Sequence, residues 1–482
     1  MTGQITDHGT KVTDLASSAE ADVVGDLLAR ARAAMKAFEP RDQAAVDEAV
    51  TAVAWSVYKP EHAQALAELA VADTGLGNVQ DKFIKNQRKT FGTLRDLLRA
   101  RSVGVIEEQP ELGIAKYAKP VGVVAALTPS TNPAATPANK TMMALKGRNA
   151  IIIAPSPSGH SATALAVEFM RAALERIGAP ANLVQVLPPP VTKGVTQRLM
   201  EASDLVVVTG SQNNVHAAYS SGKPAIGVGA GNVPVIIDES ADLGDAASKI
   251  QASKTFDHAT SCSSENALVI LDSVYEPMLT ALEQVGGWRL DSHQKSSLER
   301  ALWIDGKLNR ELIARPAGVI ATAAGLPQAA TRASFLMVED DGVGSAHPFS
   351  DEKLSPVLTI YRAPDLDAAI DRTSAILDFK GRGHSCGIHT REPENAQRVA
   401  ERVDVVRVLV NMAHTFGNGG GFDSGLNFTL SMGCGTWQGN SISENLSYRH
   451  FINVTHLAVQ IPEDRPSEEA LFGTYWARHG RD

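Results

Sequence analysis

The sequence contains three cysteines, and one of them, Cys262, has neighbours that suit a nucleophile. It lies in FDHATSCSSE (256–265), where hydroxyl side chains surround the thiol just before the apolar run ALVIL. A thiolate attacks carbonyl carbons readily, but a free thiol has a pKa of about 8.5 and needs help to ionise. His258 and His384 are the histidines we consider for that help. The alternative is a buried, inert cysteine, which is the common state of a free cysteine.

Cys386 and Cys434 are the other two cysteines, and their spacing predicts neither a disulfide framework nor a zinc site. An odd number of widely separated cysteines does not form a stapled scaffold, and no Cys-x-x-Cys pair is present. We therefore expect no bound metal. The first residues, MTGQITDHGTKVTD, lack an apolar stretch of signal-peptide length, so we expect a cytoplasmic protein.

The composition argues against several classes of partner. The 482 residues are 44% hydrophobic and 21% charged, with a formal net charge of −9. An acidic chain has no positive field to hold a polyanion, so we expect no nucleic-acid partner. No run of about 18 uncharged apolar residues is present, so we expect no membrane span. The length favours two or more domains.

The elements that must position Cys262 begin with a helical region. From Glu20 to about Leu98 apolar residues recur three and four positions apart, and one helix ends at Gly75. After Gly104, short β-rich runs alternate with helices; the runs are 121–127, 149–155, 183–189, 205–210 and 233–238. Runs that are apolar throughout are typical of a parallel sheet covered on both faces. We predict an α/β fold whose first half is a doubly wound, dinucleotide-type domain.

Ligands of doubly wound sheets bind at the carboxyl ends of the strands, which directs attention to three loops. They are TPSTNP (128–133), PSPSGH (155–160) and TGSQ (209–212). The candidate cofactor-binding residues in them are Thr128, Pro129, Ser130, Ser156, Ser158, His160, Thr209, Gly210 and Ser211. GVGAGN (227–232), which contains Gly229, precedes a strand instead of opening a helix, so it is a weak phosphate-binding candidate.

A second α/β unit begins near Ala241, with β-rich runs at 266–272, 333–339, 355–363 and 405–411. The last part is rich in glycine and ends in a β-like segment, which we expect to form a small ribbon with 111–120. The predicted domains are 1–240, interrupted by the ribbon strand 111–120, then 241–430, and a C-terminal segment 431–482. Because the ribbon would leave unpaired edges, we expect it to support a homodimer or homotetramer.

Taken in order, the motifs resemble those of the aldehyde dehydrogenase superfamily over roughly residues 20–460. TPSTNP with Asn132 resembles its asparagine loop, VTGS (208–211) its cofactor-facing turn and FDHATSCSSE its cysteine loop. EKLSPVL (352–358) resembles its glutamate loop, and GCGTWQGNSISENLSYRHFIN (433–453) resembles the C-terminal part of its CoA-acylating branch. The resemblance implies a doubly wound cofactor-binding domain, an α/β catalytic domain and a small oligomerisation ribbon.

The resemblance also implies roles for particular residues. Cys262 is expected to add to an aldehyde, with Asn132 and the backbone N–H of Cys262 stabilising the oxyanion before hydride transfer leaves a thioester. Glu352 is expected to contact the ribose of the cofactor; the alternative is an exposed charge at the start of a strand. His384, in GRGHSCGI, matches a histidine of the acylating branch and is expected to assist proton or thiol transfer.

A missing residue favours the acylating branch. Hydrolytic members carry a glutamate that activates water, whereas the matching stretch AIGVGAGN (225–232) has no acidic residue. Without a positioned base, water attack on a thioester loses a factor of about 10² to 10⁴. We therefore expect CoA to accept the acyl group, in a reaction that can also run backwards. The alternatives are a hydrolytic aldehyde dehydrogenase and a non-catalytic nucleotide-binding protein.

Cofactor and substrate are also expected from the resemblance. The loop with Ser156, Ser158 and His160 has no acid to repel a 2′-phosphate, so NADP and NAD both stay open. SENLSYRHFINVTHL (443–457) looks most like acylating enzymes for the sulfonated aldehyde sulfoacetaldehyde. Candidate contacts for the sulfonate are His258, Thr260, Arg382 and the loop 414–422. The runner-up substrate is a short uncharged aldehyde, acetaldehyde or propionaldehyde.

Overall fold

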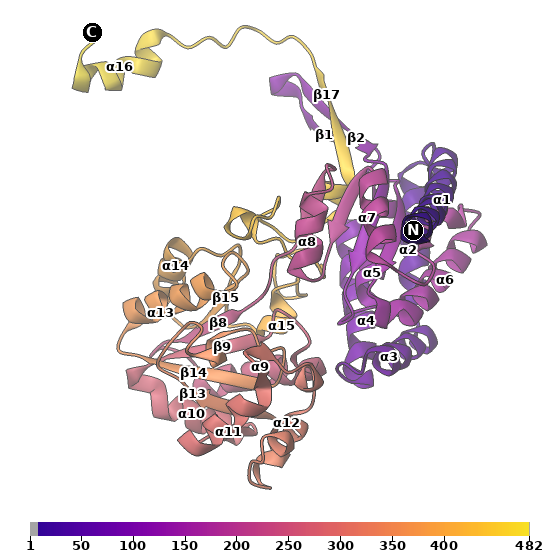
Figure 1. Cartoon of the computed structure of the whole chain (residues 1–482). Helices are drawn as coiled ribbons and strands as arrows, with labels where there is room; N and C mark the ends of the chain where they lie inside the picture. The colour runs from indigo at the N-terminus through magenta and orange to yellow at the C-terminus, as the bar shows by residue number, and fades with distance from the viewer. Residues whose placement is uncertain (1–7, 482) are drawn as a thin grey trace, which may run out of the picture.

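A computed structural model describes the backbone of residues 8–481 and the side chains of residues 20–481. Two α/β bodies lie next to each other, and an antiparallel ribbon projects from the body that holds the N-terminal helices (Figure 1). The C-terminal part of the chain runs between the bodies before it joins the ribbon (Figure 1). This arrangement agrees with the predicted α/β fold.

The N-terminal helices form as predicted, because capping residues mark their ends. They are α1 (His8–Phe38), α2 (Gln43–Tyr58), α3 (Pro60–Thr74) and α4 (Val79–Leu98). The Asp42 carboxylate accepts a hydrogen bond of 2.9 Å from the backbone N–H of Ala45 and so caps α2. Helix α3 ends at Gly75, whose φ of 65° is a left-handed conformation that glycine adopts easily. Helix α4 matters most for function, because it reaches the cysteine loop.

The first sheet has five parallel strands in the order β5-β4-β3-β6-β7. The strands are β3 (Val123–Thr128), β4 (Ala150–Pro155), β5 (Val184–Val186), β6 (Leu205–Val208) and β7 (Ala225–Gly227). Its helices are α5 (Ala135–Lys146), α6 (His160–Arg176), α7 (Lys193–Ala202) and α8 (Gln212–Tyr219). Every residue of β3, β4 and β6 is buried, as expected for a sheet that helices cover on both faces.

The second sheet has seven parallel strands in the order β10-β13-β14-β9-β8-β15-β16. They are β8 (Val233–Ile237), β9 (Glu265–Leu271), β10 (Gly287–Arg289), β13 (Phe335–Glu339), β14 (Val357–Ala363), β15 (Cys386–His389) and β16 (Val408–Val410). Around it lie α9 (Leu243–Thr255), α10 (Tyr275–Gln284), α11 (Ser292–Leu302), α12 (Ala317–Ala323), α13 (Leu366–Phe379) and α14 (Pro393–Arg402), with a hairpin of β11 (Trp303–Ile304) and β12 (Lys307–Leu308).

One strand departs from the prediction. We expected 233–238 to continue the first sheet, but β8 pairs with β9 and β15 in the second. An apolar run identifies a buried strand without identifying its partners, which is why the sequence did not separate the two sheets. The second body therefore begins before residue 233 and not near residue 240.

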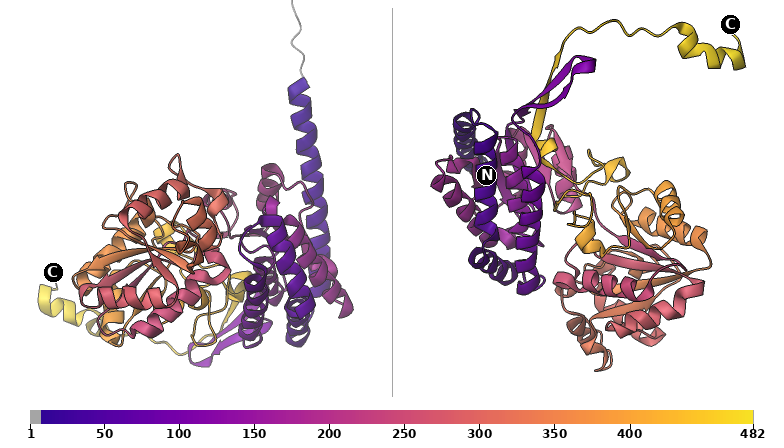
Figure 2. Two further views of the ribbon diagram at one scale, coloured as in Figure 1. Left: turned by 90° about the horizontal axis from the view of Figure 1, so that it is seen from below. Right: turned by 180° about the vertical axis from the view of Figure 1, so that it is seen from behind.

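The predicted ribbon is present as a three-stranded antiparallel sheet. Its strands are β1 (Gly104–Gln109), β2 (Ile114–Pro120) and β17 (Ile452–Ala458), with β2 in the middle. Most side chains of β17 are exposed, among them Val454 and Leu457. Beyond β17 the chain ends in α16 (Glu468–His479), which has no buried residue and lies away from both bodies (Figure 2).

Residues 411–451 connect the two bodies. This segment contains the short helix α15 (His414–Gly417) and otherwise little regular structure. It contacts the first body through a 2.6 Å hydrogen bond between the hydroxyls of Thr209 and Ser431. It contacts the second through Asn418, whose Nδ2 donates to Ser263 Oγ at 2.9 Å. The segment therefore reaches the cysteine loop and the carboxyl edge of the first sheet together.

Candidate active site

Cys262 lies in the loop that joins α9 to β9, the middle strand of the second sheet. A 3-10 turn precedes it, in which Asp257, His258 and Ala259 have φ values of 51°, 52° and 58°. Left-handed backbone at a residue other than glycine costs about 1–3 kcal/mol and persists only where the surroundings hold it. Three such residues in succession require a strong anchor.

The carboxylate of Asp257 is that anchor, and it ties the turn to helix α4. It is fully buried and lies 2.5 Å from Lys85 Nζ and 3.1 Å from Lys82 Nζ. It also accepts hydrogen bonds from the backbone N–H of Asn78 and from Thr260 Oγ1. Burial alone would raise the pKa of Asp257, but the two lysines hold it below its usual value. Thr260, a candidate substrate contact, is thus part of the anchor.

The thiol of Cys262 is half-buried and borders a small cavity together with Lys254, Asn232 and Glu352. Burial raises the pKa of Cys262 to about 12, and the negative charge of Glu352 adds to this effect. The backbone of Gly231 packs directly on the cysteine, because a Cβ built there would lie 2.8 Å from the Cβ of Cys262. The glycine loop therefore covers the nucleophile and, as the sequence indicates, carries no acid.

Glu352 and Lys254 form the ionisable lining of this cavity. Burial raises the pKa of Glu352 to about 8 and lowers the pKa of Lys254 to about 7. At neutral pH Glu352 is therefore mostly protonated, and a large fraction of Lys254 is a neutral amine. The predicted ribose contact of Glu352 stays a prediction, while the structure adds that Glu352 also faces the nucleophile's cavity.

Asn132 lines a second cavity, which also includes Ser261 and Ser263 on either side of Cys262. Its buried Oδ1 has no hydrogen-bond partner, and its Nδ2 has only a distant contact of 3.5 Å with Thr131 Oγ1. A buried amide without partners is costly unless a ligand uses it. The structure therefore brings the predicted asparagine to the cysteine loop with its amide available.

Three cations of helix α4 line the same second cavity, and we did not predict them. They are Lys85, Arg88 and Lys89, which share one face of the helix because they are three and four positions apart. A charged helix face usually predicts a surface exposed to solvent, but the side chains of Lys85 and Lys89 are buried. Phe416 and Gly419 of the predicted loop 414–422 complete this part of the wall.

Three other candidates lie elsewhere. His258 borders a separate cavity of about 890 Å³ between the start of α4 and α12. Arg382 is exposed and forms ion pairs with Asp404 and Asp378, so the structure does not bring it to the cysteine. His384 is buried and does not line either cavity; its Nδ1 contacts Ser385 Oγ at 2.8 Å, its Nε2 has no partner, and burial holds its pKa well below the usual value.

Comparison with known sequences decides the family. Residues 5–295 match the sequence profile of the Aldehyde dehydrogenase family, which is more than half of the chain. This chain belongs to the aldehyde dehydrogenase family. The motif resemblance is therefore confirmed, together with the predicted fold.

Individual relatives align with nearly the whole length of this chain. An acylating sulfoacetaldehyde dehydrogenase of Cupriavidus necator is 53% identical over 96% of this chain and 94% of its own length. A second acylating sulfoacetaldehyde dehydrogenase, from Bilophila wadsworthia, is 42% identical over 95% of this chain and 99% of its own. An acetylating aldehyde dehydrogenase from Geobacillus thermoglucosidasius superposes with a TM-score of 0.89 at 36% identity, covering 94% of this chain and 99% of that one.

The dinucleotide loops of this aldehyde dehydrogenase offer groups that suit a cofactor. Thr128 and Ser156, at the ends of β3 and β4, have buried hydroxyl oxygens without partners. Such hydroxyls at the carboxyl edge of a parallel sheet suit the polar parts of a dinucleotide. Gly210 also has open space, since a Cβ there would meet only Asn214 Nδ2 at 3.6 Å. The residues present therefore fit a dinucleotide.

Of the remaining candidates for cofactor binding in these loops, some are accessible and others already form hydrogen bonds within the protein. Pro129 and Ser130 are half-buried, and Ser158 is exposed. His160 Nε2 lies 3.0 Å from the carbonyl of Leu187. Thr209 and Ser211 have bonds within the protein, Thr209 to Ser431 and Ser211 as the cap of α8.

Gly229 does not form an open cradle. A Cβ there would lie 2.0 Å from Gln438 Oε1 and 2.9 Å from Cys434 Sγ, so the segment 411–451 fills the space that the glycine leaves. The glycine therefore allows close packing of Gln438 and Cys434, and its contact with the cofactor stays a prediction.

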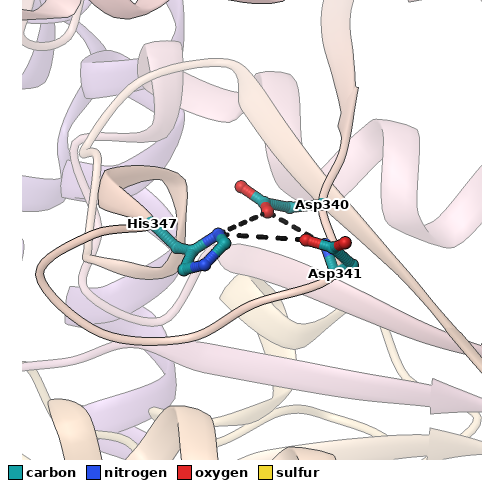
Figure 3. Close-up of side chains that lie close together, drawn as sticks. All are labelled: Asp340, Asp341 and His347. Atoms are coloured by element: carbon teal, nitrogen blue, oxygen red, sulfur yellow. Dashed lines mark hydrogen bonds and ion pairs between the residues drawn. The ribbon is translucent and has the colours of Figure 1, made fainter.

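One further cluster of ionisable groups lies apart from Cys262. Figure 3 shows His347 beside Asp340 and Asp341, with Nδ1 of the histidine 2.9 Å and 4.0 Å from the two carboxylates. Lys295 Nζ also pairs with Asp340 at 3.2 Å. Burial alone would raise the pKa of Asp340, but the hydrogen bond with His347 and the charge of Lys295 hold it below its usual value.

In the part of the chain that the structure describes, none of the helices combines the length and apolar character needed to cross a membrane.

Proposed function

We propose that this aldehyde dehydrogenase is a CoA-acylating enzyme that oxidises sulfoacetaldehyde to sulfoacetyl-CoA. One observation carries the proposal: the nucleophile's loop borders a cavity with an unpartnered amide, while the loop packed on the nucleophile has no acidic side chain. The first feature supports thioester chemistry, and the second argues against its hydrolysis.

The first step is addition of Cys262 to the aldehyde carbon. Because burial raises the pKa of Cys262 to about 12, the group that adds must lose its proton in the site. Lys254 borders the same cavity, and burial lowers its pKa to about 7, so its neutral amine suits that proton. The carbonyl oxygen becomes an oxyanion, which the Nδ2 of Asn132 and the backbone N–H of Cys262 are proposed to stabilise.

A bound nicotinamide dinucleotide would supply the hydride acceptor, with Thr128 and Ser156 among the residues that hold it. Cys262 then carries the acyl group as a thioester, and the thiol of CoA takes this group while the cysteine sulfur leaves with a proton. The loop 155–160 contains no acid, so it supports acceptance of NADP as well as NAD. His384 stays a candidate for proton transfer in the second half of the reaction.

Water is a poor competitor for the thioester. The loop 227–232 offers no carboxylate, Lys254 holds the proton that it took from Cys262, and Glu352, which borders the cavity, has a pKa raised to about 8 by burial. A carboxylic acid that is mostly protonated at pH 7 is a weak general base. The acyl group therefore persists until a thiol arrives.

The sulfonate assignment rests on two supports. Two relatives that match over nearly their whole length bear the name of sulfoacetaldehyde dehydrogenase. In addition, the cavity that Asn132, Ser261 and Ser263 line is also lined by lysine and arginine side chains, which suit an anionic substrate better than acetaldehyde or propionaldehyde.

We also infer that the enzyme self-associates through the ribbon. Strand β17 is one of the two edge strands of the ribbon, and the apolar side chains of Val454 and Leu457 are exposed on it. An exposed, apolar edge strand is a site for pairing with another chain. A homodimer or homotetramer would cover it.

The test is to incubate the purified enzyme with sulfoacetaldehyde and NADP, and in parallel with NAD, and to follow reduced cofactor before and after CoA is added. We expect sustained turnover only with CoA, and sulfoacetyl-CoA as the product. Sustained turnover to sulfoacetate without CoA would overturn the acylating mechanism. Turnover of acetaldehyde or propionaldehyde with CoA, but none of sulfoacetaldehyde, would overturn the substrate assignment alone.

A further inference from the structure

We propose that Arg88 and Lys89 of helix α4 form the anion subsite that selects the sulfonate of the substrate. This inference rests on the proposed function and names residues that decide its specificity. Both side chains line the cavity that also includes Asn132, Ser261 and Ser263. Cys262 itself borders the other cavity, but its neighbours Ser261 and Ser263 both line this one, and the charge of Cys262 acts on Lys89. In the proposed complex the sulfonate, two bonds from the carbonyl carbon that Cys262 attacks, occupies the cavity beside Arg88 and Lys89.

Lys89 is buried and Arg88 is half-buried, and among residues 20–481 neither has the carboxylate partner that a charge removed from water normally requires. Among the described residues, no ion pair involves Arg88 or Lys89. Lys89 Nζ donates to the carbonyl of Gly419 at 2.8 Å, and Arg88 reaches the carbonyl of Phe416 at 3.5 Å. The Nε of Arg88 is buried without any partner. A buried charge that only carbonyl groups solvate is costly, and an anion bound between the two cations would offset that cost.

The electrostatics agree with this geometry. Burial, followed by repulsion from Arg88 and Lys85, lowers the pKa of Lys89 to about 7. Burial also lowers the pKa of Arg88, which the charge of Asp423 opposes only in part. Lys85 differs from its neighbours, because Asp257 neutralises it. Because a large fraction of Lys89 is neutral at pH 7, an incoming anion would stabilise its charged form, together with the unpaired charge of Arg88.

Packing alone does not account for both cations. Arg88 lies over the rings of Phe416, Phe422 and Phe428 at 5.2–5.8 Å, and Lys89 lies 5.5 Å from Phe428. Cation–π contacts of this kind hold a guanidinium in position, but a methionine would fill the same space without the charge. Arg95 stacks on Phe422 and Phe428 in the same way without lining the cavity, so it is the matched control.

The test compares K89M and R88M with R95M, using sulfoacetaldehyde and propionaldehyde, each with CoA. A charge-assisted hydrogen bond is worth about 10- to 100-fold in binding. We expect K89M and R88M each to lower kcat/KM for sulfoacetaldehyde by about that factor, mainly through KM. For propionaldehyde, which has no anionic group, kcat/KM should stay within about threefold. K89R should keep most of the selectivity, and R95M should leave both substrates unchanged.

Equal losses for the two aldehydes in K89M and R88M would show a structural role and overturn the subsite. Inhibition by ethanesulfonate separates this inference from the proposed function. We expect ethanesulfonate to compete with propionaldehyde in the wild type and to lose potency about 10-fold or more in K89M. If the wild type turned over no sulfoacetaldehyde, that competition would still report on the subsite. Ethanesulfonate inhibition that is equal in wild type and K89M would overturn it.

Discussion

Replacing Asn132 by alanine should abolish most of the activity without affecting stability. The Nδ2 of Asn132 has a single contact of 3.5 Å, longer than the 2.9–3.0 Å typical of an N–H···O bond, and its Oδ1 has no partner. The amide therefore contributes almost nothing to folding. Removing one oxyanion donor, in contrast, costs about 10² to 10³ in kcat, or about 2.7–4 kcal/mol of transition-state stabilisation.

Asn149 is the matched control, because its amide is fully used by the fold. Its Oδ1 accepts from the backbone N–H groups of Val121 and Gly122 at 2.8 Å and 3.1 Å. Its Nδ2 donates to the carbonyls of Ala144 and Phe451 at 3.0 Å and 2.7 Å. N149A leaves these buried backbone groups without partners, at about 1–3 kcal/mol for each. We therefore expect a clear loss of stability in N149A.

The assay measures kcat per active cysteine, counted from the burst of reduced cofactor without CoA or by thiol titration, and the melting temperature of each variant. N132A should keep the wild-type melting temperature while kcat falls 10²- to 10³-fold. N149A should melt several degrees lower and keep kcat per folded site. A kcat of N132A within threefold of the wild type would refute the oxyanion role, and a melting temperature as low as that of N149A would refute the energetic reasoning.

Three further predictions follow from the same contacts. Because burial raises the pKa of Cys262 to about 12, alkylation of its thiol by iodoacetamide should accelerate about tenfold per pH unit from pH 7 to 10, and a plateau near neutral pH would contradict this. Because burial raises the pKa of Glu352 to about 8, the E352Q variant should be alkylated faster than the wild type only above about pH 8. The G231A variant should lose activity and about 1–3 kcal/mol of stability in thermal melting, since its Cβ would lie 2.1 Å from the carbonyl oxygen of Cys262. The control is G244A, whose Cβ would lie 3.8 Å from its nearest neighbour and which should melt at or above the wild-type temperature. L457D on the ribbon should shift the mass measured by light scattering toward the monomer, and an unchanged mass would exclude the ribbon as the interface.

The sequence predicted the parts of the site that local patterns encode. Cys262 and Asn132 were identified because each sits in a loop with a recognisable motif, and the strands around them were identified because parallel strands are apolar throughout. The ribbon was predicted from an isolated β-like segment that needed a partner. Each of these features is visible in a short stretch of sequence, although the ribbon itself pairs strands as distant in the chain as Pro120 and Ile452.

The parts that were missed depend on contacts between distant segments. Lys85 and Lys89 belong to a charged helix face. Both are buried, Lys85 beside Asp257 of the cysteine turn and Lys89 beside Gly419 of the segment 411–451. Arg382 was a candidate because a sulfonate requires a cation, but the structure places it at the surface in an ion pair with Asp404. Strand β8 was assigned to the wrong sheet because its apolar residues would suit either one. In each case the sequence shows the chemical type of a residue but not which distant residues it contacts in the fold.

The segment 411–451 has a consequence for how the enzyme becomes active during folding. Lys89 and Gly419, whose hydrogen bond shapes the substrate cavity, are 330 residues apart. The strands of the first sheet, in contrast, pair within a stretch of about a hundred residues. Contacts of long sequence separation close late, because the entropy of the intervening loop must be overcome first. After dilution from denaturant, helical signal should therefore return before the enzyme regains activity, and the cysteine should pass through a folded but inactive state in which it is open to oxidation.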